Sequence, residues 1–259
     1  MGAAEPPPAP GRGGVHLILR KLVATFNSEK TELMHFSKRI MSSEESDVTF
    51  NGTAIIKTES CKFLGVLLDS DMKFRSHIDM VTVKLSKNAG LLYRLKDSLT
   101  QSARLSFYYG LIYPFLTYNV IVEGGTNEGH LTKLKVQHKR IIRTLCDAGR
   151  FEHTSPLFYS LGLLKFAEIY KFYMGIYMYK AIAEGKFTIE HNLNTRNRNL
   201  ACPSFQRLSN CQQAISYQGP QVWNSLPECI RKSSSLRVFK ADLKRYYLNS
   251  YSSQPCIPV

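Results

Sequence analysis

The chain has 259 residues, of which 44% are hydrophobic and 11% aromatic, so it can build a packed core and is not expected to be disordered throughout. It carries 34 lysines and arginines against 20 acidic residues, a formal net charge of +14. No apolar run approaches about 18 residues without a charge, which argues against a transmembrane helix. No stretch has the pattern of a secretory signal. We therefore expect an intracellular protein, in the nucleus or cytoplasm, without membrane contact.

The positive charge is gathered in two blocks. Residues 73–143 hold 12 basic against 4 acidic residues, and residues 186–248 hold 10 against 3. The segments 1–72 and 144–185 are close to neutral, with 8 against 9 and 4 against 4. A groove that binds phosphates concentrates lysine and arginine in this way, whereas the alternative is a merely solvated face on basic helices. The blocks favour contact with nucleic acid.

The six cysteines, at positions 61, 146, 202, 211, 229 and 256, contain no Cys-x-x-Cys pair. This usage fits free thiols in a reducing compartment. His191, Cys202, Cys211 and Cys229 have side chains that can bind zinc, but they lack the spacing of about two to four residues that short zinc-ligand loops use. No metal site is expected in this chain.

In chain order, residues 1–14 are rich in proline and glycine and lack large apolar side chains, so they predict a disordered leader. Residues 15–27 suit a helix remnant, and Thr31–Ser37 alternates as a strand does. Asn51-Gly52 lies between two short strand-like runs and predicts a β-hairpin, because both central residues of a type I′ turn need positive φ. Cys61–Leu68 is a nearly continuous apolar run, which predicts a single strand covered on both faces.

Beyond the strands, apolar residues recur every three or four positions, which is the period of amphipathic helices. The first and third helices are basic. The first three helices have short connections and predict a bundle, and Pro114 is expected to end or kink the second. The segment Phe166–Ala183 is apolar nearly all round, so packing in the core is favoured over stacking of its aromatic rings on bases. Residues 186–216 predict a loop. The expected helices are Ser76–Leu95, Gln101–Tyr113, Asn127–Cys146, one that starts with a capping hydroxyl and proline at Thr154-Ser155-Pro156, Phe166–Ala183 and Ser235–Leu248.

Five motifs follow one another along the chain. They are Asn27-x-x-Lys30-Thr31-x-x-Met34-x-Phe36, Lys62-Phe63-Leu64-Gly65-Val66-Leu67-Leu68-Asp69 followed by His77-Ile78, Arg104-x-x-x-Tyr108-x-x-x-Ile112-x-Pro114-x-x-x-Tyr118, Gln137-x-x-Arg140-x-x-Arg143, and Gly219-Pro220-x-x-Trp223-Asn224-x-Leu226-Pro227-x-x-Ile230-Arg231 with Phe239-Lys240-x-x-Leu243. In this order and spacing the chain resembles, from about Phe26 to Leu248, the reverse transcriptase of jockey-like non-LTR retrotransposons.

The resemblance implies the C-terminal part of an RNA-directed DNA polymerase: the last palm motifs, the primer grip, the thumb and the region after it. The fold class expected is mainly α with a small antiparallel β element. An incomplete palm edge, made of a hairpin and the primer-grip strand, precedes a helical thumb bundle and a C-terminal helical region. The expected domains are 1–14 (leader), 15–75 (residual palm and primer grip), 76–150 (thumb-like bundle), 151–185 (apolar core helices) and 186–259 (basic and partly irregular).

The same resemblance assigns candidate nucleic-acid contacts. The primer end would lie against Phe63, Leu64, Gly65 and Val66. The duplex phosphates would lie against His77, Lys84, Lys87, Arg94, Lys139, Arg140 and Arg143, contacts that position a duplex without reading its sequence. For His77 the alternative of a buried, hydrogen-bonded histidine stays open.

The carboxylates of a polymerase active site are not found in this sequence. Such an enzyme needs aspartates that hold two magnesium ions, and the chain contains no Asp-Asp dipeptide. Asp69-x-Asp71 is a poor substitute, because two acids alone seldom retain magnesium without substrate phosphates. Lys30 matches the family's lysine on the pyrophosphate side, where an ammonium acts as a general acid. No cofactor is expected in this chain, although magnesium serves the intact family enzyme.

Motifs of other enzyme classes are not found either, since the chain has no Gly-rich phosphate loop, Gly-x-Ser-x-Gly or His-Glu-x-x-His. We expect a polymerase fragment that binds RNA/DNA duplex or single-stranded nucleic acid weakly and with strong salt dependence, and that does not polymerise. Two alternatives remain at this point. One is a non-catalytic RNA- or DNA-binding or scaffold protein derived from such an element, and the other is a helical module that binds an acidic protein partner. The oligomeric state is not indicated.

Overall fold

The structure is a computed structural model that describes residues 31–36, 49–50, 53–187, 201 and 211–252. Its internal contacts divide the chain into two units, residues 1–59 and residues 60–259. Several predictions fall outside the described residues: the leader at 1–14, the helix remnant at 15–27, Lys30, and most of the loop at 186–216.

The first unit contains four strands of two residues each among its described residues. Strands β2 (Thr49–Phe50) and β3 (Thr53–Ala54) pair antiparallel with Phe50 opposite Thr53, so only Asn51 and Gly52 lie between them. The hairpin predicted from Asn51-Gly52 is confirmed. Strand β1 (Glu32–Leu33) is shorter than the strand predicted over residues 31–37, and it pairs in parallel with β4 (Ile56–Lys57).

The second unit begins with another hairpin, and here the prediction of one continuous strand over Cys61–Leu68 is wrong. Strands β5 (Ser60–Phe63) and β6 (Val66–Asp69) pair antiparallel with Phe63 opposite Val66. The two residues between them, Leu64 and Gly65, have φ of 47° and 85°. Positive φ at both central positions is the geometry of a type I′ turn, which folds the apolar run back on itself.

A bundle of helices follows the hairpin. It contains α2 (Arg75–Leu95), α3 (Gln101–Leu111) and α6 (Glu128–Leu145), joined through η2 (Lys96–Ser98) and the short helices α4 (Tyr113–Thr117) and α5 (Val120–Glu123). As predicted, the second helix ends just before Pro114, which lies in the first turn of α4. The side-chain oxygen of Thr100 accepts a hydrogen bond at the start of α3, and that of Asn127 does so at the start of α6.

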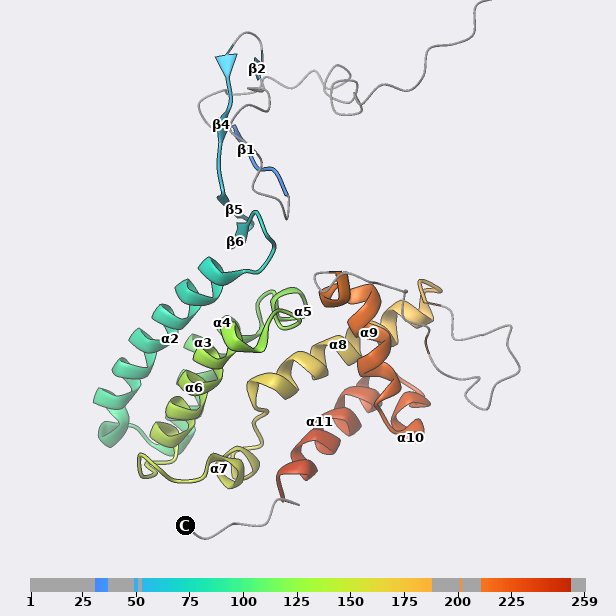
Figure 1. The fold of residues 1–259 in the computed structure, drawn as a ribbon. Helices are drawn as coiled ribbons and strands as arrows, with labels where there is room; N and C mark the ends of the chain where they lie inside the picture. The colour runs from blue at the N-terminus through green and yellow to red at the C-terminus, as the bar shows by residue number, and fades with distance from the viewer. Residues whose placement is uncertain (1–30, 37–48, 51–52, 188–200, 202–210, 253–259) are drawn as a thin grey trace, which may run out of the picture. The chain divides into compact units, whose positions relative to one another are not determined.

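The remaining helices pack around α8 (Phe166–Ala183), whose limits agree with the prediction. Figure 1 shows α8 between the bundle and the last helix, α11 (Leu236–Ser252). Helix α7 (Thr154–Ser160) begins at the predicted position, although the cap residue is His153 and no side chain caps it. Three short elements in this part of the chain were not predicted, as is also true of η2, α4 and α5 in the bundle. They are η3 (Cys211–Gln213), α9 (Ile215–Asn224) and α10 (Glu228–Arg231).

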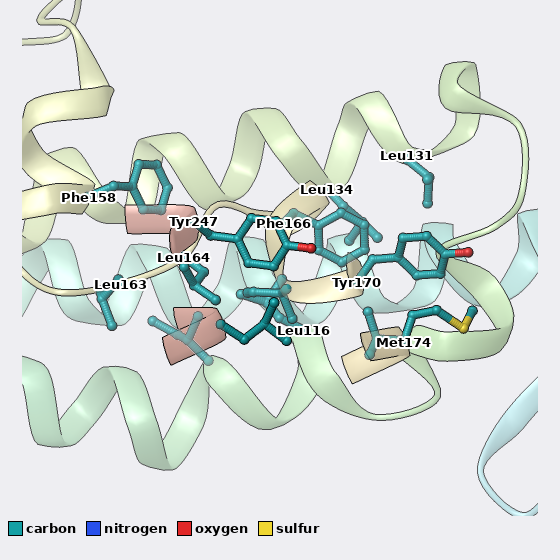
Figure 2. Packing of buried hydrophobic residues seen from close by; sticks show 14 of the residues in the cluster. Leu116, Leu131, Leu134, Phe158, Leu163, Leu164, Phe166, Tyr170, Met174 and Tyr247 are labelled. Atoms are coloured by element: carbon teal, nitrogen blue, oxygen red, sulfur yellow. The ribbon is translucent and has the colours of Figure 1, made fainter. Parts of the chain in front are cut away.

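One hydrophobic core joins these helices. Buried side chains from α4, α6, α7, α8 and α11 meet in it, and Figure 2 shows Leu116, Leu134, Phe158, Phe166 and Tyr247 among them. The predicted fold class, mainly α with a small antiparallel β element, is confirmed, and a parallel strand pair is added to it. No helix in the described part of the chain is long and apolar enough to cross a membrane.

Candidate nucleic-acid interface

The hairpin turn presents two apolar side chains to solvent. The side chains of Phe63 and Leu64 are 60% and 75% exposed, whereas Val66 is buried against the core. The Tyr118 hydroxyl donates a hydrogen bond to the carbonyl oxygen of Leu64, and Gly65 lies against the same tyrosine ring. This contact brings together two motifs that are more than fifty residues apart in sequence, and it holds the turn against the bundle.

His77 lies inside the protein at the start of α2. Its Nδ1 accepts a hydrogen bond from the backbone N–H of Leu67 at 3.4 Å, and its Nε2 lies 3.3 Å from Oε2 of Glu123. Both side chains are buried. Burial lowers the pKa of His77, and burial raises the pKa of Glu123 to about 8. This geometry fits the buried alternative for His77 and leaves its ring no direct access to a phosphate.

Asp69, the last residue of β6, and Asp71 organise the start of α2. Asp69 Oδ2 accepts a hydrogen bond from the backbone N–H of Ser76 at 3.4 Å. Asp71 forms ion pairs with Lys73, at 3.0 Å, and with Arg75. Burial is the largest single influence on the pKa of Asp71 and raises it. Hydrogen bonds from Lys73 and the charges of Arg75 and Lys73 together outweigh burial, so the pKa of Asp71 is lowered. Both carboxylates therefore stabilise the local chain.

The six cations predicted to hold phosphates lie on α2 and α6, which pack side by side (Figure 1). All are exposed except Arg143, which is half-buried, and none forms an ion pair with a carboxylate in the described residues. They are Lys84, Lys87, Arg94, Lys139, Arg140 and Arg143.

Their surroundings differ. The ammonium of Lys84 lies 5.5 Å from the centre of the Phe115 ring on α4, and Nε of Arg143 donates to the carbonyl oxygen of Glu152 at 2.9 Å. Lys87 and Arg94 are seven residues apart and so share one face of α2. Lys139, Arg140 and Arg143 lie within about one turn of α6.

Other lysines of the same bundle are paired with acids. Lys133 lies 2.7 Å from Asp79 and links α6 to α2, while Lys135 pairs with Glu128, and Lys96 with Asp147. Since these cations already have carboxylate partners, they have less charge to offer a phosphate. The six predicted cations are thus distinguished from their neighbours by the lack of such partners.

Arg104 and Tyr108 belong to a recognised motif, but sequence reasoning gave them no role. The guanidinium of Arg104 donates to the carbonyl oxygens of Lys96, Leu99 and Leu145, at 2.6, 3.2 and 3.3 Å. It therefore holds the C-terminal ends of two helical segments together.

Tyr108 is equally structural. Its hydroxyl lies 2.9 Å from Nε2 of His138, and both side chains are buried. Burial lowers the pKa of His138 to about 3, so the imidazole is neutral. The periodic placement of both residues on the inner faces of α3 and α6 is the signal that could have identified this pair.

No group of three or more histidine, cysteine, aspartate or glutamate side chains that could hold a metal ion is found in the described ranges. This finding concerns those ranges alone, and Lys30 lies outside them. The prediction that the chain holds no metal of its own stays a prediction.

The chain is similar in sequence to RNA-directed DNA polymerases of mobile elements. It is 28% identical over 114 residues to the RNA-directed DNA polymerase from mobile element jockey of Drosophila funebris, which covers 42% of this chain and 12% of that protein. The jockey polymerase of Drosophila melanogaster is 24% identical over 51% of this chain and 14% of its own length. A probable RNA-directed DNA polymerase from transposon BS of the same species is 21% identical over 56% and 16%.

The predicted resemblance to jockey-like polymerases is confirmed by these relatives, of which the chain spans well under one fifth. No family model matches the chain, and no solved structure matches it.

Proposed function

We propose that this chain is part of a retrotransposon RNA-directed DNA polymerase and that it supplies the thumb and primer grip. In this role the bundle of α2 and α6 holds an RNA/DNA duplex through its phosphates. The relatives are RNA-directed DNA polymerases, and the matched part of this chain corresponds to 12% to 16% of their length.

The observation that carries the proposal is the contrast between paired and unpaired cations. In the described part of α2 and α6, the six predicted lysines and arginines lack carboxylate partners, whereas Lys133 and Lys135 have them. An unpaired surface cation releases counterions from the nucleic acid when it reaches a phosphate, which favours binding at low salt. Solubility depends on the net charge of the surface, so it does not require that particular cations lack carboxylate partners.

The hairpin turn supports the same proposal for the primer end. Phe63 and Leu64 are exposed apolar residues on a turn that Tyr118 holds in place. Leu64 adopts a left-handed conformation that costs a non-glycine residue about 1 kcal/mol or more. Strain of this kind persists where the surrounding structure holds it, and we assign the turn the positioning of the primer terminus.

Binding of an RNA/DNA duplex by the whole chain tests the proposal. The variant Lys87→Gln/Arg94→Gln/Arg140→Gln removes three unpaired cations, and Lys96→Gln/Lys133→Gln/Lys135→Gln removes three paired ones with the same change in net charge. The first variant is expected to reduce the slope of log K against log salt by about 2 to 3, because each phosphate contact contributes about 0.9. The second is expected to stay near wild type. Equal effects of the two variants, or binding that does not depend on salt, would contradict the proposal.

The proposal includes no nucleotide transfer by this chain alone, since its sequence contains no Asp-Asp dipeptide. Magnesium-dependent incorporation of nucleotides on a primed RNA template by the 259-residue chain would overturn this part. For Lys30 we propose only that it matches the family's lysine on the pyrophosphate side, and we assign it no step of a reaction.

A further inference from the structure

A shallow hollow of about 610 Å³ lies between α8 and α11, on residues that the proposed thumb does not use. Helix α8 contributes one lining residue, and α11 contributes the other five. The lining residues are Phe172, Leu236, Arg237, Lys240, Ala241 and Lys244.

Three of these residues are cations with no acidic partner in the described ranges. Arg237, Lys240 and Lys244 are spaced at i, i+3 and i+7, so they lie along one face of α11 over a length of about 10 Å. Other cations of this region are paired: Arg245 lies 3.4 Å from Asp242, and Lys232 lies 2.7 Å from Glu228. The hollow thus repeats the contrast found on α2 and α6, and its lining contains no acid.

The apolar part of the lining includes an aromatic ring. Phe172 is half-buried, and its ring meets the ring of Tyr173 edge-on at 5.6 Å. Leu236 and Ala241 complete the apolar lining. A row of cations beside an aromatic ring is the arrangement by which proteins hold single-stranded nucleic acid, with phosphates on the cations and a base on the ring.

We propose that this hollow binds a single-stranded segment of RNA or DNA, with phosphates on Arg237, Lys240 and Lys244 and one base on Phe172. A base within a duplex cannot stack on Phe172, because its neighbours cover both of its faces, so this ring favours an unpaired strand. The site lies on different residues from the proposed thumb, so it stands or fails independently of duplex binding by α2 and α6.

The first test measures binding of a labelled oligouridine RNA by the whole chain. Arg237→Gln/Lys240→Gln/Lys244→Gln is compared with Lys186→Gln/Lys232→Gln/Arg245→Gln, three cations that each pair with a carboxylate. The first variant is expected to weaken binding about tenfold or more at low salt, and to reduce the salt slope by about 2, at about 0.7 per contact with a single strand. The second is expected to bind like wild type. Equal binding by the two variants would overturn the proposal.

Two further arms identify the ligand. Phe172→Leu keeps the charge and much of the packing, and it is expected to weaken oligouridine binding about fivefold or more through the lost stacking. Unchanged binding by this variant would show that no base stacks on Phe172. Polyglutamate is expected to compete poorly with the RNA, and equal competition at matched charge would show that the hollow binds an acidic polypeptide instead.

The Lys87/Arg94/Arg140 variant described above separates the two proposals. It is expected to lose duplex binding while its oligouridine binding stays largely intact, and the α11 variant is expected to show the reverse. If the Lys87/Arg94/Arg140 variant keeps duplex binding, the proposed thumb site is contradicted. If the α11 variant keeps oligouridine binding, the hollow is contradicted. Neither result bears on the other site.

Discussion

At the scale of single residues, the buried pair of His77 and Glu123 ties the hairpin to the helical bundle. His77 accepts a hydrogen bond from the backbone of β6, and Glu123 approaches it from α5. Because Leu67 donates to Nδ1, the proton of the neutral ring lies on Nε2, which faces the carboxyl group. For His77 the sequence left open a phosphate contact or a buried, hydrogen-bonded histidine, and the structure places it where it organises the adjacent hairpin.

The pair predicts a pH dependence of stability. The pKa of Glu123 is raised by burial to about 8 in the folded chain, against an ordinary value of 4.5. Between these two pKa values the folded chain keeps a proton on Glu123 that the unfolded chain releases. The free energy of unfolding therefore falls as pH rises from about 4.5 through about 8. Between pH 7 and 8 we expect a loss on the order of 1 kcal/mol, and Glu123→Gln should remove it.

Urea denaturation at pH values above 7 measures this effect. In that range His77 is neutral in the folded and the unfolded chain, because burial lowers its pKa in the folded chain. Glu128→Gln serves as the control, because Glu128 is exposed and pairs with Lys135. If wild type and Glu123→Gln show the same change of unfolding free energy with pH, Glu123 does not carry a raised pKa.

Arg104 provides a second prediction at this scale. Its guanidinium donates to three backbone carbonyls at helix ends, a fork that the single ammonium of lysine cannot reproduce. Arg104→Lys should lower the free energy of unfolding by about 1 to 3 kcal/mol, since hydrogen bonds from charged donors contribute about 1.5 to 3 kcal/mol each. Chemical denaturation measures this, with Arg94→Lys, an exposed residue, as the matched substitution. An Arg104→Lys variant as stable as wild type would show that charge alone suffices.

At the scale of secondary-structure elements, the long helices were predictable because their apolar residues recur at the helical period. The α9 helix was not, since Gly219 and Pro220 in its middle are residues that usually end helices. Both are buried, and a side chain on Gly219 would lie 2.6 Å from the sulfur of Met178. Close packing on α8 therefore decides this helix against its local propensity.

A pair of glycines separates packing from helix propensity. A Cβ at Gly175 of α8 would lie 2.9 Å from a methyl group of the buried Leu243 on α11, whereas a Cβ at Gly90 of α2 would meet nothing within 4 Å. Gly175→Ala should destabilise by about 1 to 3 kcal/mol through overpacking. Gly90→Ala should stabilise by about 0.5 to 1 kcal/mol, because alanine is the better helix former.

Thermal or urea unfolding of the two alanine variants measures both effects with the same substitution in each helix. A stabilised Gly175→Ala variant would show that Leu243 moves aside without cost. In that case α8 and α11 do not need glycine for their close approach.

At the scale of the whole molecule, the core lies within the second unit. Every buried residue of the described core cluster falls between Val66 and Tyr251, while the strands of the first unit are two residues long. A single core of this kind unfolds as one cooperative unit.

A fragment of residues 60–259 should therefore fold by itself. We expect one cooperative unfolding transition. We also expect a helical circular dichroism signal that, per mole of protein, equals that of the whole chain, because every helix of the described residues lies within the fragment. A fragment that unfolds gradually, or that loses helical signal, would show that the core depends on residues 1–59.

The sequence alone determined the resemblance to jockey-like polymerases, the mainly helical class and most helix limits, because these depend on local period and motif order. It also determined which cations to consider, since charge blocks are visible without coordinates. Only the tertiary structure decided that Phe63 and Leu64 stand at an exposed turn and that His77 is buried. It also separated paired from unpaired cations and placed Phe172 beside the cations of α11. Those properties depend on neighbours that are distant in the chain, and a local pattern holds no information about them.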